Sequence, residues 1–562
     1  MSSSLPLAVG SHPLGIKPLG NAWFDGVQST RSHDLGYFSK LEDAFLLQLL
    51  IEWLDAPSLL RLSAAGRSFY ALGNTPSVWR EKYIADFHED ILVWHGSWRA
   101  MYAAAHLKRQ SASEHDLAMI RAASQCQVSA KGVYSEAIYH EFMTSAFDPA
   151  PFLEHHARLE QKRLRRVRKV STEEAHGHPR FSDNFTRVNA KKMSAFDFVS
   201  HYAEKNYPCI LVHATEDWPC RTWSLDYICQ AWGSRIFQAE AIRISGRAYI
   251  DYARSYGGGG QPDSQIGAVP DTSPFYLFDA TVAAEEVEAS KGWRIPSAIV
   301  RYPAQYTESS SDEESADATR ADLFSLMGAM RPDYRWLIAG PARSGSGWHK
   351  DPNMTSAWNA VMHGTKYWMM LPPDVSPPGV FVSEDHSEVT APASLSEWML
   401  DFYAETKAKH GRRECGGDGQ LLEGVCAAGE VMYVPSGWWH LVINLDESVA
   451  LTQNFVSKAE LSSVLAFMKY SPDQISGFRS KTGKETLYDT FLSRLLDYDT
   501  TMTQQAVNEM KKPAFCAPAT DVSKEDSHVS WRERLCQDAT ATSTWSLAGC
   551  IDDSELGDIP WS

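Results

Sequence analysis

One short stretch in the second half of the chain, GSGWHKDPNMTSAW at 345–358, places a histidine and an aspartate one residue apart. His349 and Asp351 offer an imidazole nitrogen and a carboxylate oxygen, which can both bind a metal ion. On a strand, alternate side chains point the same way, so both would face inward while Lys350 faces outward. The spacing also fits two polar side chains on an ordinary strand. A metal site would still need a third ligand, an anion anchor and open coordination positions.

The candidate third ligand is His440, in VPSGWWHLVINL at 434–445. A Pro-Ser-Gly turn precedes two tryptophans that start a strand, so His440 can face the same interior. Two histidines and one carboxylate leave three positions of an octahedral ion free, which is the arrangement of non-haem Fe(II) oxygenases. A structural zinc site would prefer four closed positions with cysteine. A zinc- or manganese-bearing cupin with hydrolytic or no activity is an alternative.

A 2-oxoglutarate cosubstrate makes a second demand, because its far carboxylate needs a buried cation and polar donors around it. Lys366, in GTKYW, lies on the next predicted strand, where its long stem can reach inward. Asn359 offers an amide and Thr452 a hydroxyl. A zinc or manganese cupin explains the ligands but leaves this anchor without a purpose.

The segments that must position these residues are rich in β-branched and aromatic residues. Between 334 and 456, short runs divided by Pro and Gly predict an antiparallel β-barrel or jelly roll. From about 183 to 300, runs such as AEAIRISGRAYIDYA alternate with helical patches. We therefore predict one catalytic region over 183–456, interrupted by an acidic, serine-rich surface loop at 307–322 that is expected to be disordered.

The region before it is predicted to be helical. Residues 1–36 are rich in Ser, Gly and Pro and predict a flexible or loosely packed arm. Residues 37–87 resemble an F-box, with an apolar helix, a Leu-Asp-x-Pro turn, a leucine-rich helix and then Arg-x-Phe-x-x-Leu. Lys40-Leu41-Glu42 stands where an F-box has Leu-Pro, and a generic three-helix bundle is the alternative.

Residues 88–182 predict a helical linker that carries a basic run at 158–170. That run fits a nuclear-localisation signal, a patch for an acidic partner or a solvated helix face. We expect the nucleus as the location, with the cytoplasm as a second one. The chain ends in predicted helices over 457–510 and a polar tail over 511–562.

Composition limits the class of protein. A chain of 562 residues is too long for one core, and its net charge of −17 argues against general nucleic-acid binding while it suits a basic protein partner. The nine cysteines include no Cys-x-x-Cys pair, which fits a reducing compartment. No apolar run approaches the roughly 20 residues of a membrane span, and no signal peptide is expected, so we predict an intracellular, soluble protein without a membrane partner.

Three segments together resemble the jumonji-C oxygenases: PARSGSGWHKDPNMTSAWNAVMHGTKYWMMLPP, GEVMYVPSGWWHLVINLDESVALTQNFVS and SPFYLFDA. The likeness covers roughly 183–470 and is strongest to the branch of the bifunctional arginine demethylase and lysyl-hydroxylase, once described as a phosphatidylserine receptor. It implies that His349, Asp351 and His440 bind iron and that Lys366 and Thr452 hold the 2-oxoglutarate carboxylate, with Ser346, Asn359 and Tyr276 completing the cosubstrate pocket.

The resemblances imply a multidomain α+β protein: an α-helical F-box, then a double-stranded β-helix (jelly-roll or cupin) domain with flanking helices, then a C-terminal helical tail. They imply a protein hydroxylase or demethylase that uses Fe(II), 2-oxoglutarate and O2 on lysine or arginine side chains of a basic protein, such as a histone or an RNA-processing factor. The F-box implies docking to a Skp-type adaptor and a cullin ubiquitin ligase. The helices at 459–500 could form a homodimer, as in the relative. The alternative is a substrate adaptor whose barrel only binds its target.

Overall fold

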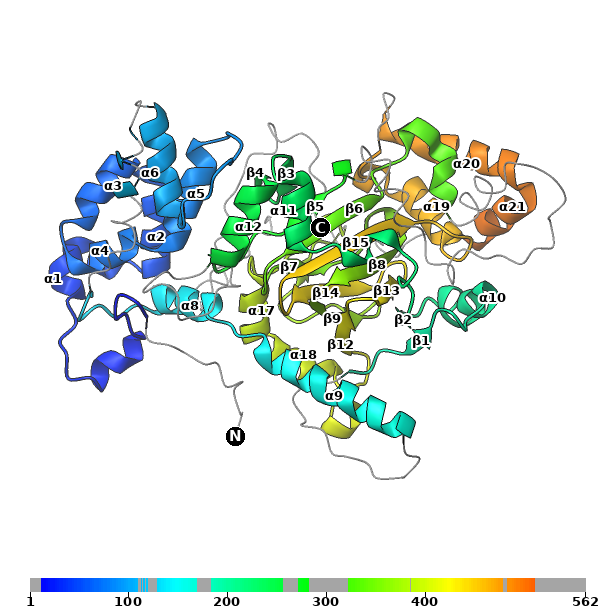
Figure 1. The fold of residues 1–562 in the computed structure, drawn as a ribbon, viewed down its shortest axis with the longest axis horizontal. Helices are drawn as coiled ribbons and strands as arrows, with labels where there is room; N and C mark the ends of the chain where they lie inside the picture. The colour runs from blue at the N-terminus through cyan, green and yellow to red at the C-terminus, as the bar shows by residue number, and fades with distance from the viewer. Residues whose placement is uncertain are drawn as a thin grey trace, which may run out of the picture.

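The computed structural model describes residues 12–109, 129–168, 183–255, 271–282, 322–384, 386–478 and 483–510, with a few residues between 113 and 119. These residues form a mixed α+β structure in which N-terminal helices lie beside a β-rich centre and C-terminal helices pack at its other side (Figure 1). The predicted loop at 307–322, apart from Asp322, and the predicted tail at 511–562 lie outside the described residues.

The larger of two facing sheets has nine strands in the order β1-β2-β13-β8-β15-β6-β5-β3-β4. All neighbouring pairs in it are antiparallel except β1 and β2. Its strands are β1 (Arg187–Asn189), β2 (Cys209–Val212), β3 (Ile236–Ala239), β4 (Ile242–Ser245), β5 (Leu277–Asp279), β6 (Arg335–Gly340), β8 (Ser356–His363), β13 (Val431–Val434) and β15 (Ser448–Phe455).

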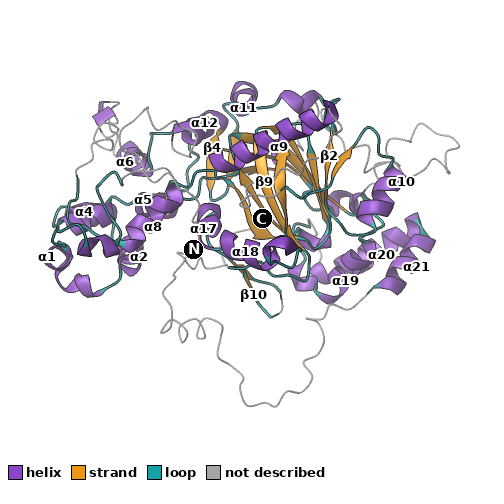
Figure 2. Cartoon of the chain, turned by 90° about the horizontal axis from the view of Figure 1, so that it is seen from below, coloured by secondary structure: helices purple, strands orange, loops and turns teal. Residues whose placement is uncertain are grey.

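The smaller sheet has the order β12-β9-β14-β7. Its strands are β12 (Leu422–Ala427), β9 (Thr365–Leu371), β14 (Trp439–Asn444) and β7 (Gly345–His349), while β10 (Phe381–Val382) and β11 (Val389–Thr390) form a separate hairpin. Alternate residues of both sheets meet in one apolar cluster that includes Ala357, Trp368, Met432 and Val442. Helices surround the strands in the perpendicular view (Figure 2).

The N-terminal helices begin and end at the predicted turn residues. The Asp55 carboxylate accepts a hydrogen bond from the Ser58 amide at 2.8 Å. It thereby caps the start of α3, which has proline in its first turn. The helices are α2 (Asp43–Trp53), α3 (Ala56–Ser63), α4 (Arg67–Gly73) and α5 (Pro76–Asp86). They continue in α6 (Trp98–Arg109), α8 (Glu136–Ser145) and α9 (Ala150–Arg168). The basic run is thus helical up to Arg168, and the side chains beyond Leu159 are not described.

The predicted arm at 1–36 packs against the rest of the protein at several of its described residues, 12–36. Ile16 and Leu35 are buried in the main core, and Lys17 forms a β-bridge with Tyr134. This segment forms η1 (Leu19–Trp23) and α1 (Arg31–Leu35), followed by η2 (Gly36–Lys40). Leu14, Ile16 and Leu35 attach this segment to the core, whereas Trp23 and Phe24 remain exposed.

One apolar core runs from the N-terminal helices into the larger sheet. Leu47 and Leu59 of these helices belong to the same cluster as Phe237 and Leu451 of the sheet. Ile91 pairs in parallel with Ile244 of β4, since its amide donates to Arg243 and its carbonyl accepts from Ser245, both at 2.8 Å. In the described part of the chain, the two regions therefore share one core.

Further helices cover the sheets and adjoining loops: α10 (Ala195–Phe198), η3 (Val199–Ala203), η4 (Pro219–Thr222), α11 (Leu225–Trp232), α12 (Gly246–Ser255), η5 (Leu323–Met330), η6 (Pro352–Met354), α17 (Leu395–Asp401), α18 (Tyr403–His410) and η7 (Arg413–Cys415). The run AEAIRISGRAYIDYA is therefore a strand only in its first half. Gly246 begins a helix whose tyrosines and alanines face the core.

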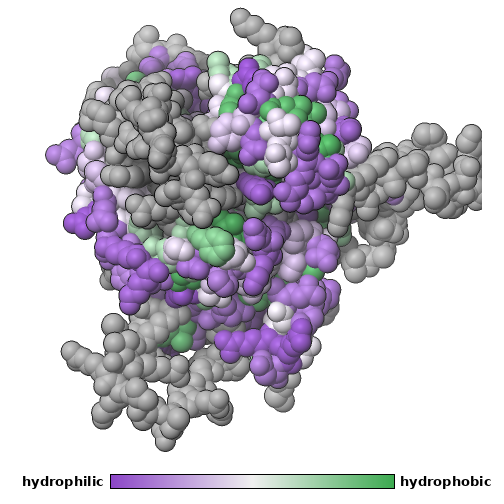
Figure 3. Space-filling model, turned by 90° about the vertical axis from the view of Figure 1, so that its right-hand side faces the viewer, coloured by the Kyte–Doolittle hydropathy of each residue, from purple (hydrophilic) through white to green (hydrophobic). Residues whose placement is uncertain are grey.

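At the C-terminal side, α19 (Leu461–Tyr470), α20 (Leu487–Tyr498) and α21 (Thr500–Glu509) pack with η8 (Pro472–Gln474) and η9 (Lys484–Thr486). Their apolar faces form a cluster with η5 of the same chain. On the side of the molecule seen in Figure 3, the coloured hydrophobic residues form small groups among hydrophilic ones. Homodimer formation through 459–500 stays a prediction. No helix among the described residues is long and apolar enough to cross a membrane.

Candidate active site

Three predicted ligands meet between the end of β7 and the start of β14. His349 and His440 are direct register partners in the antiparallel pair β7–β14, and their ring centroids are 4.0 Å apart. Asp351 joins them, so that one potential ligand atom from each of the three residues lies within 4.8 Å of the others. We call His349, Asp351 and His440 the barrel trio. The structure thus brings together residues that lie 91 positions apart in sequence.

In both histidines of the barrel trio, Nδ1 lies within hydrogen-bond distance of a backbone carbonyl. The Nδ1 atom of His349 lies 2.7 Å from the Gly347 carbonyl, and that of His440 lies 3.1 Å from the Trp438 carbonyl. Each Nδ1 therefore carries the proton, and each Nε2 presents a lone pair. Oδ2 of Asp351 is buried and has no hydrogen-bond partner. Two neutral imidazoles beside one unused carboxylate oxygen fit a divalent metal ion.

The electrostatics point the same way. Burial lowers the pKa of His349 and of His440 to about 4, so both rings are neutral at pH 7. Burial also raises the pKa of Asp351 to about 6, because its charge finds little compensation from the protein. A cation between these groups would supply that compensation.

Asp351 was predicted to lie on the same strand as His349, but it lies beyond the end of that strand. Strand β7 ends at His349, and Asp351 stands in extended conformation before the short helix η6, which Pro352 begins. Lys350 does point away from the barrel trio, as predicted. Its ammonium donates to the Pro373 carbonyl at 2.9 Å and lies 4.7 Å from the centre of the Trp439 ring.

The predicted anion anchor is a fully buried lysine. The Lys366 ammonium donates to the Tyr276 hydroxyl at 2.6 Å and to the Asn444 side-chain oxygen at 2.7 Å. The Asn444 amide in turn donates to the Ser344 hydroxyl at 2.9 Å. Burial lowers the pKa of Lys366 to about 7, since its two close partners are neutral. An anionic ligand beside it would restore the charged form.

The other predicted pocket residues are arranged differently. Asn359 and Thr452 are cross-strand partners of β8 and β15, and the side-chain oxygen of Asn359 is buried without a hydrogen-bond partner. The Thr452 hydroxyl donates to the Trp358 carbonyl at 3.0 Å, and no direct contact joins it to Lys366 among the described interactions. Ser346 stands opposite Val442, which faces the space between the sheets.

The sequence reasoning missed two asparagines. Asn444 follows His440 at even spacing on β14, and Asn454 follows Thr452 on β15, so period-two alternation could have placed both on the inner face. The amide of Asn454 donates to Oδ1 of Asp351 at 3.2 Å and to Thr355 at 3.0 Å. It therefore orients the one carboxylate of the barrel trio.

A second group of potential ligands lies between α8 and α17. It consists of His140, Glu397 and Asp401, which we call the helix trio, and His140 Nε2 lies 3.7 Å from Asp401 Oδ2. Both of these side chains are more than 40% exposed. The helix trio contains no residue that the sequence had predicted.

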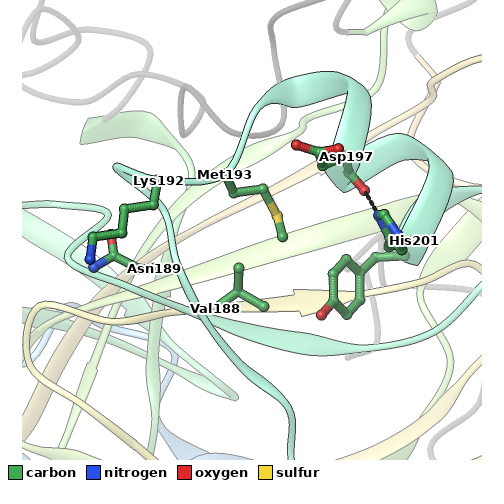
Figure 4. Close-up of a pocket in the computed structure, with 7 residues that line it drawn as sticks. Val188, Asn189, Lys192, Met193, Asp197 and His201 are labelled. Atoms are coloured by element: carbon green, nitrogen blue, oxygen red, sulfur yellow. Dashed lines mark hydrogen bonds between the residues drawn. The ribbon is translucent and has the colours of Figure 1, made fainter.

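A surface pocket of about 390 Å³ lies beside β1 and α10 (Figure 4). In it, His201 Nδ1 lies 2.8 Å from the Asp197 carbonyl, and Met193 and Val188 supply apolar walls. None of its lining residues belongs to the predicted site or to either trio.

Comparison with known proteins agrees with this geometry. The cupin-like domain family matches residues 194–460. The chain is 33% identical over 492 residues to the arginine-specific demethylase JMJ22 of Arabidopsis thaliana, covering 87% of this chain and 82% of that protein. This likeness extends well beyond the cupin-like domain. The residues after 460 are too few to account for the difference, so it includes part of the region before residue 194.

Two other relatives match shorter parts of the chain. The bifunctional arginine demethylase and lysyl-hydroxylase psr-1 of Caenorhabditis briggsae is 28% identical over 52% of this chain and 66% of its own length. The human 2-oxoglutarate and iron-dependent oxygenase JMJD4 is 32% identical over 24% of this chain and 30% of its own length. The chain therefore belongs to the jumonji-type cupin oxygenases, a family of dioxygenases that use Fe(II), 2-oxoglutarate and O2.

Proposed function

We propose that this protein is a 2-oxoglutarate-dependent hydroxylase or demethylase acting on lysine or arginine side chains of nuclear proteins. The observation that carries the proposal is the pairing of the barrel trio with the buried Lys366. A domain that only binds a target has no need for both. The names of JMJ22 and psr-1, which specify arginine and lysine chemistry, support the choice of side chain.

In this proposal the site residues divide into a group that would bind the metal and a group that would bind the cosubstrate. His349, His440 and Asp351 hold Fe(II), and Asn454 keeps the Asp351 carboxylate in place. Lys366 and Tyr276 hold the far carboxylate of 2-oxoglutarate, with Asn359, Thr452 and Ser346 around the same space. The bound iron and cosubstrate supply the oxidation of a substrate C–H bond, with loss of formaldehyde when that carbon is an N-methyl group. The apolar residues between the sheets exclude water from it.

We also infer a double-stranded β-helix for the catalytic region. The chain passes back and forth between the two sheets from β6 to β9 and again from β12 to β15, which supports this fold. It delivers β7 and β14, the strands that carry His349 and His440, to adjacent positions. The predicted catalytic region at 183–456 and the other domain boundaries remain proposals.

The test is succinate production from 2-oxoglutarate by the full-length protein with Fe(II), in the presence and absence of basic histone-like or RNA-processing-factor peptides. The wild type should turn over, a substrate peptide should stimulate it, and Asp351→Ala should not turn over. Wild-type protein that binds neither metal nor cosubstrate would contradict the oxygenase role and favour a non-catalytic barrel that only binds its target.

We further propose that residues 37–87 are an F-box that docks to a Skp-type adaptor of a cullin ubiquitin ligase. Support comes from large apolar side chains left exposed on this region: Trp53 at 76%, Phe45 at 49% and Leu60 at 44%. Purified full-length protein should form a complex with a Skp-type adaptor, and Trp53→Asp combined with Phe45→Asp should abolish it. Equal binding by that variant would contradict this docking surface.

A nuclear location is proposed from the basic run at 158–170 and from the expected substrates. A fluorescent fusion should lose nuclear accumulation when the arginines of this run are replaced by glutamine.

A further inference from the structure

A buried carboxylate, that of Asp271, joins the N-terminal helices to the segment that leads to Tyr276. Its side chain is 3% exposed. It accepts hydrogen bonds from Trp98 Nε1 at 3.0 Å and from the Tyr252 hydroxyl at 2.7 Å, and Arg80 lies 3.4 Å from its other oxygen. Arg80 and Trp98 belong to α5 and α6, whereas Tyr252 belongs to α12 of the catalytic region. The carboxylate is therefore shared between the two regions.

Arg80 makes two further contacts with the same segment. Its Nη1 donates to the Ser273 carbonyl at 2.9 Å, and its guanidinium carbon lies 4.1 Å from the centre of the Phe275 ring. Trp98 packs edge-on against the same ring, with centroids 5.5 Å apart. Phe275 directly precedes Tyr276. The N-terminal helices thus hold both the backbone and the side chain next to the cosubstrate pocket.

The catalytic region holds the segment from its other side. The Phe275 amide donates to the Tyr252 hydroxyl at 3.0 Å, and the Phe275 carbonyl accepts from Tyr249 at 2.9 Å. Arg343, in the turn before β7, donates to the Asp271 carbonyl at 2.7 Å. With both sides fixed, the Tyr276 hydroxyl arrives 2.6 Å from the Lys366 ammonium.

We propose that Arg80 is a positioning residue of the cosubstrate pocket, so that the N-terminal helices are a working part of the oxygenase. This inference rests on the proposed role of Lys366 and Tyr276 in binding the 2-oxoglutarate carboxylate. Loss of the guanidinium leaves the Asp271 carboxylate and the Ser273 carbonyl short of a donor inside the protein. The segment then shifts, and Tyr276 moves with it, although Arg80 never touches the cosubstrate. Small displacements of a positioned group reduce binding and rate strongly.

The test uses the full-length chain with Mn(II) in place of iron and N-oxalylglycine, an isosteric analogue of 2-oxoglutarate. Calorimetry measures the affinity for Mn(II) and, on the loaded protein, the affinity for the analogue. Arg80→Met should weaken analogue binding about tenfold and leave Mn(II) binding within about twofold. Arg80→Lys, which keeps a cation near the Ser273 carbonyl, should recover part of the loss. Arg61→Met, at an exposed arginine of α3, is the matched control and should change neither affinity.

Unchanged analogue affinity in Arg80→Met would overturn the inference. So would a parallel loss of Mn(II) and analogue affinity, since that marks general damage to the fold. If Arg80→Met does not fold, Trp98→Phe takes its place, because it removes the hydrogen bond to Asp271 and part of a buried ring while it keeps an aromatic side chain beside Phe275. A loss of about threefold in analogue affinity is expected there, and no loss overturns the inference. Wild-type protein that binds Mn(II) but not the analogue would instead refute the proposed function itself.

Discussion

The barrel trio and the helix trio each bring three potential ligand atoms within 4.8 Å of one another, but their surroundings differ. In the barrel trio, an Asp351 oxygen is buried without a partner, and both histidines are fixed by backbone carbonyls. In the helix trio, His140 faces Asp401 as an ion pair, and water reaches both side chains. Proximity of ligand types is therefore common to both. A buried carboxylate oxygen without a hydrogen-bond partner distinguishes the barrel trio.

The largest effect should come from removing that atom. Asp351→Ala should lower Mn(II) or Fe(II) affinity by about 100-fold or more, because even residues that only orient a ligand contribute about 10- to 100-fold. Calorimetric metal titration measures this directly. Asp401→Ala removes the corresponding carboxylate of the helix trio and should leave the stoichiometry and affinity of metal binding unchanged. Loss of a metal equivalent in Asp401→Ala would show that the two trios do not differ as described.

Removal of the residue that orients Asp351 should have a smaller effect. Asn454→Ala deletes the 3.2 Å hydrogen bond to Oδ1 and should weaken metal binding about tenfold. Thr355→Val removes the second anchor of the Asn454 amide and the hydrogen bond from the Thr355 hydroxyl to the Pro352 carbonyl, leaves the direct bond to Asp351, and should cost less. The two variants are compared by the same titration. Equal affinities in Asn454→Ala and the wild type would mean that burial alone fixes the carboxylate.

The anchor should make cosubstrate binding depend on pH. Burial sets the Lys366 pKa at about 7, whereas a bound carboxylate raises it. Below pH 7 the lysine is already charged, so affinity is independent of pH. Above pH 7 binding takes up a proton, and affinity for N-oxalylglycine should fall by up to about tenfold per pH unit. Titrations of the Mn(II)-loaded protein between pH 6 and 9 test this, and a flat profile would contradict a neutral Lys366.

The helix trio should contribute the smallest effect. Asp401 raises the pKa of His140, so the pair stabilises the fold below the ordinary histidine pKa of about 6.5, and this contribution is lost as pH rises through the raised value. Because both side chains are exposed, it should stay below about 1 kcal/mol. Denaturant unfolding of His140→Ala and the wild type at pH 5.5 and 8.5 compares the two. A difference at pH 8.5 alone would have the wrong sign.

Local spacing was enough to predict that His349, Asp351 and His440 would lie together and that Lys366 would point inward. A histidine-x-aspartate pair, a histidine after a proline turn and an inward lysine each depend on residues within one or two strands. Asp351 was placed on the strand in error, because the sequence analysis gave Pro352 no role in ending β7 at His349. The site residues were thus easier to predict than the elements that carry them.

Residues that act through long-range contacts could not be predicted in the same way. Arg80 and Asp271 lie 191 positions apart, and neither has a local pattern that predicts a contact. The composition of the second half of AEAIRISGRAYIDYA predicts a strand. Tyr249 and Tyr252 are nevertheless helical, because both pack into the main core from one face of α12. Tertiary packing overrides local preference at such positions.

The β-bridge between Ile91 and Ile244 has a consequence for solubility. Strand β4 is the last strand at one end of the nine-stranded sheet, and an open strand there would present free amide and carbonyl groups to other chains. Ile91 pairs with two backbone groups of this edge, the Arg243 carbonyl and the Ser245 amide. A protein shortened to begin after residue 91 would therefore leave the edge of β4 unpaired. Such a protein should self-associate through that edge even if its catalytic region stays folded.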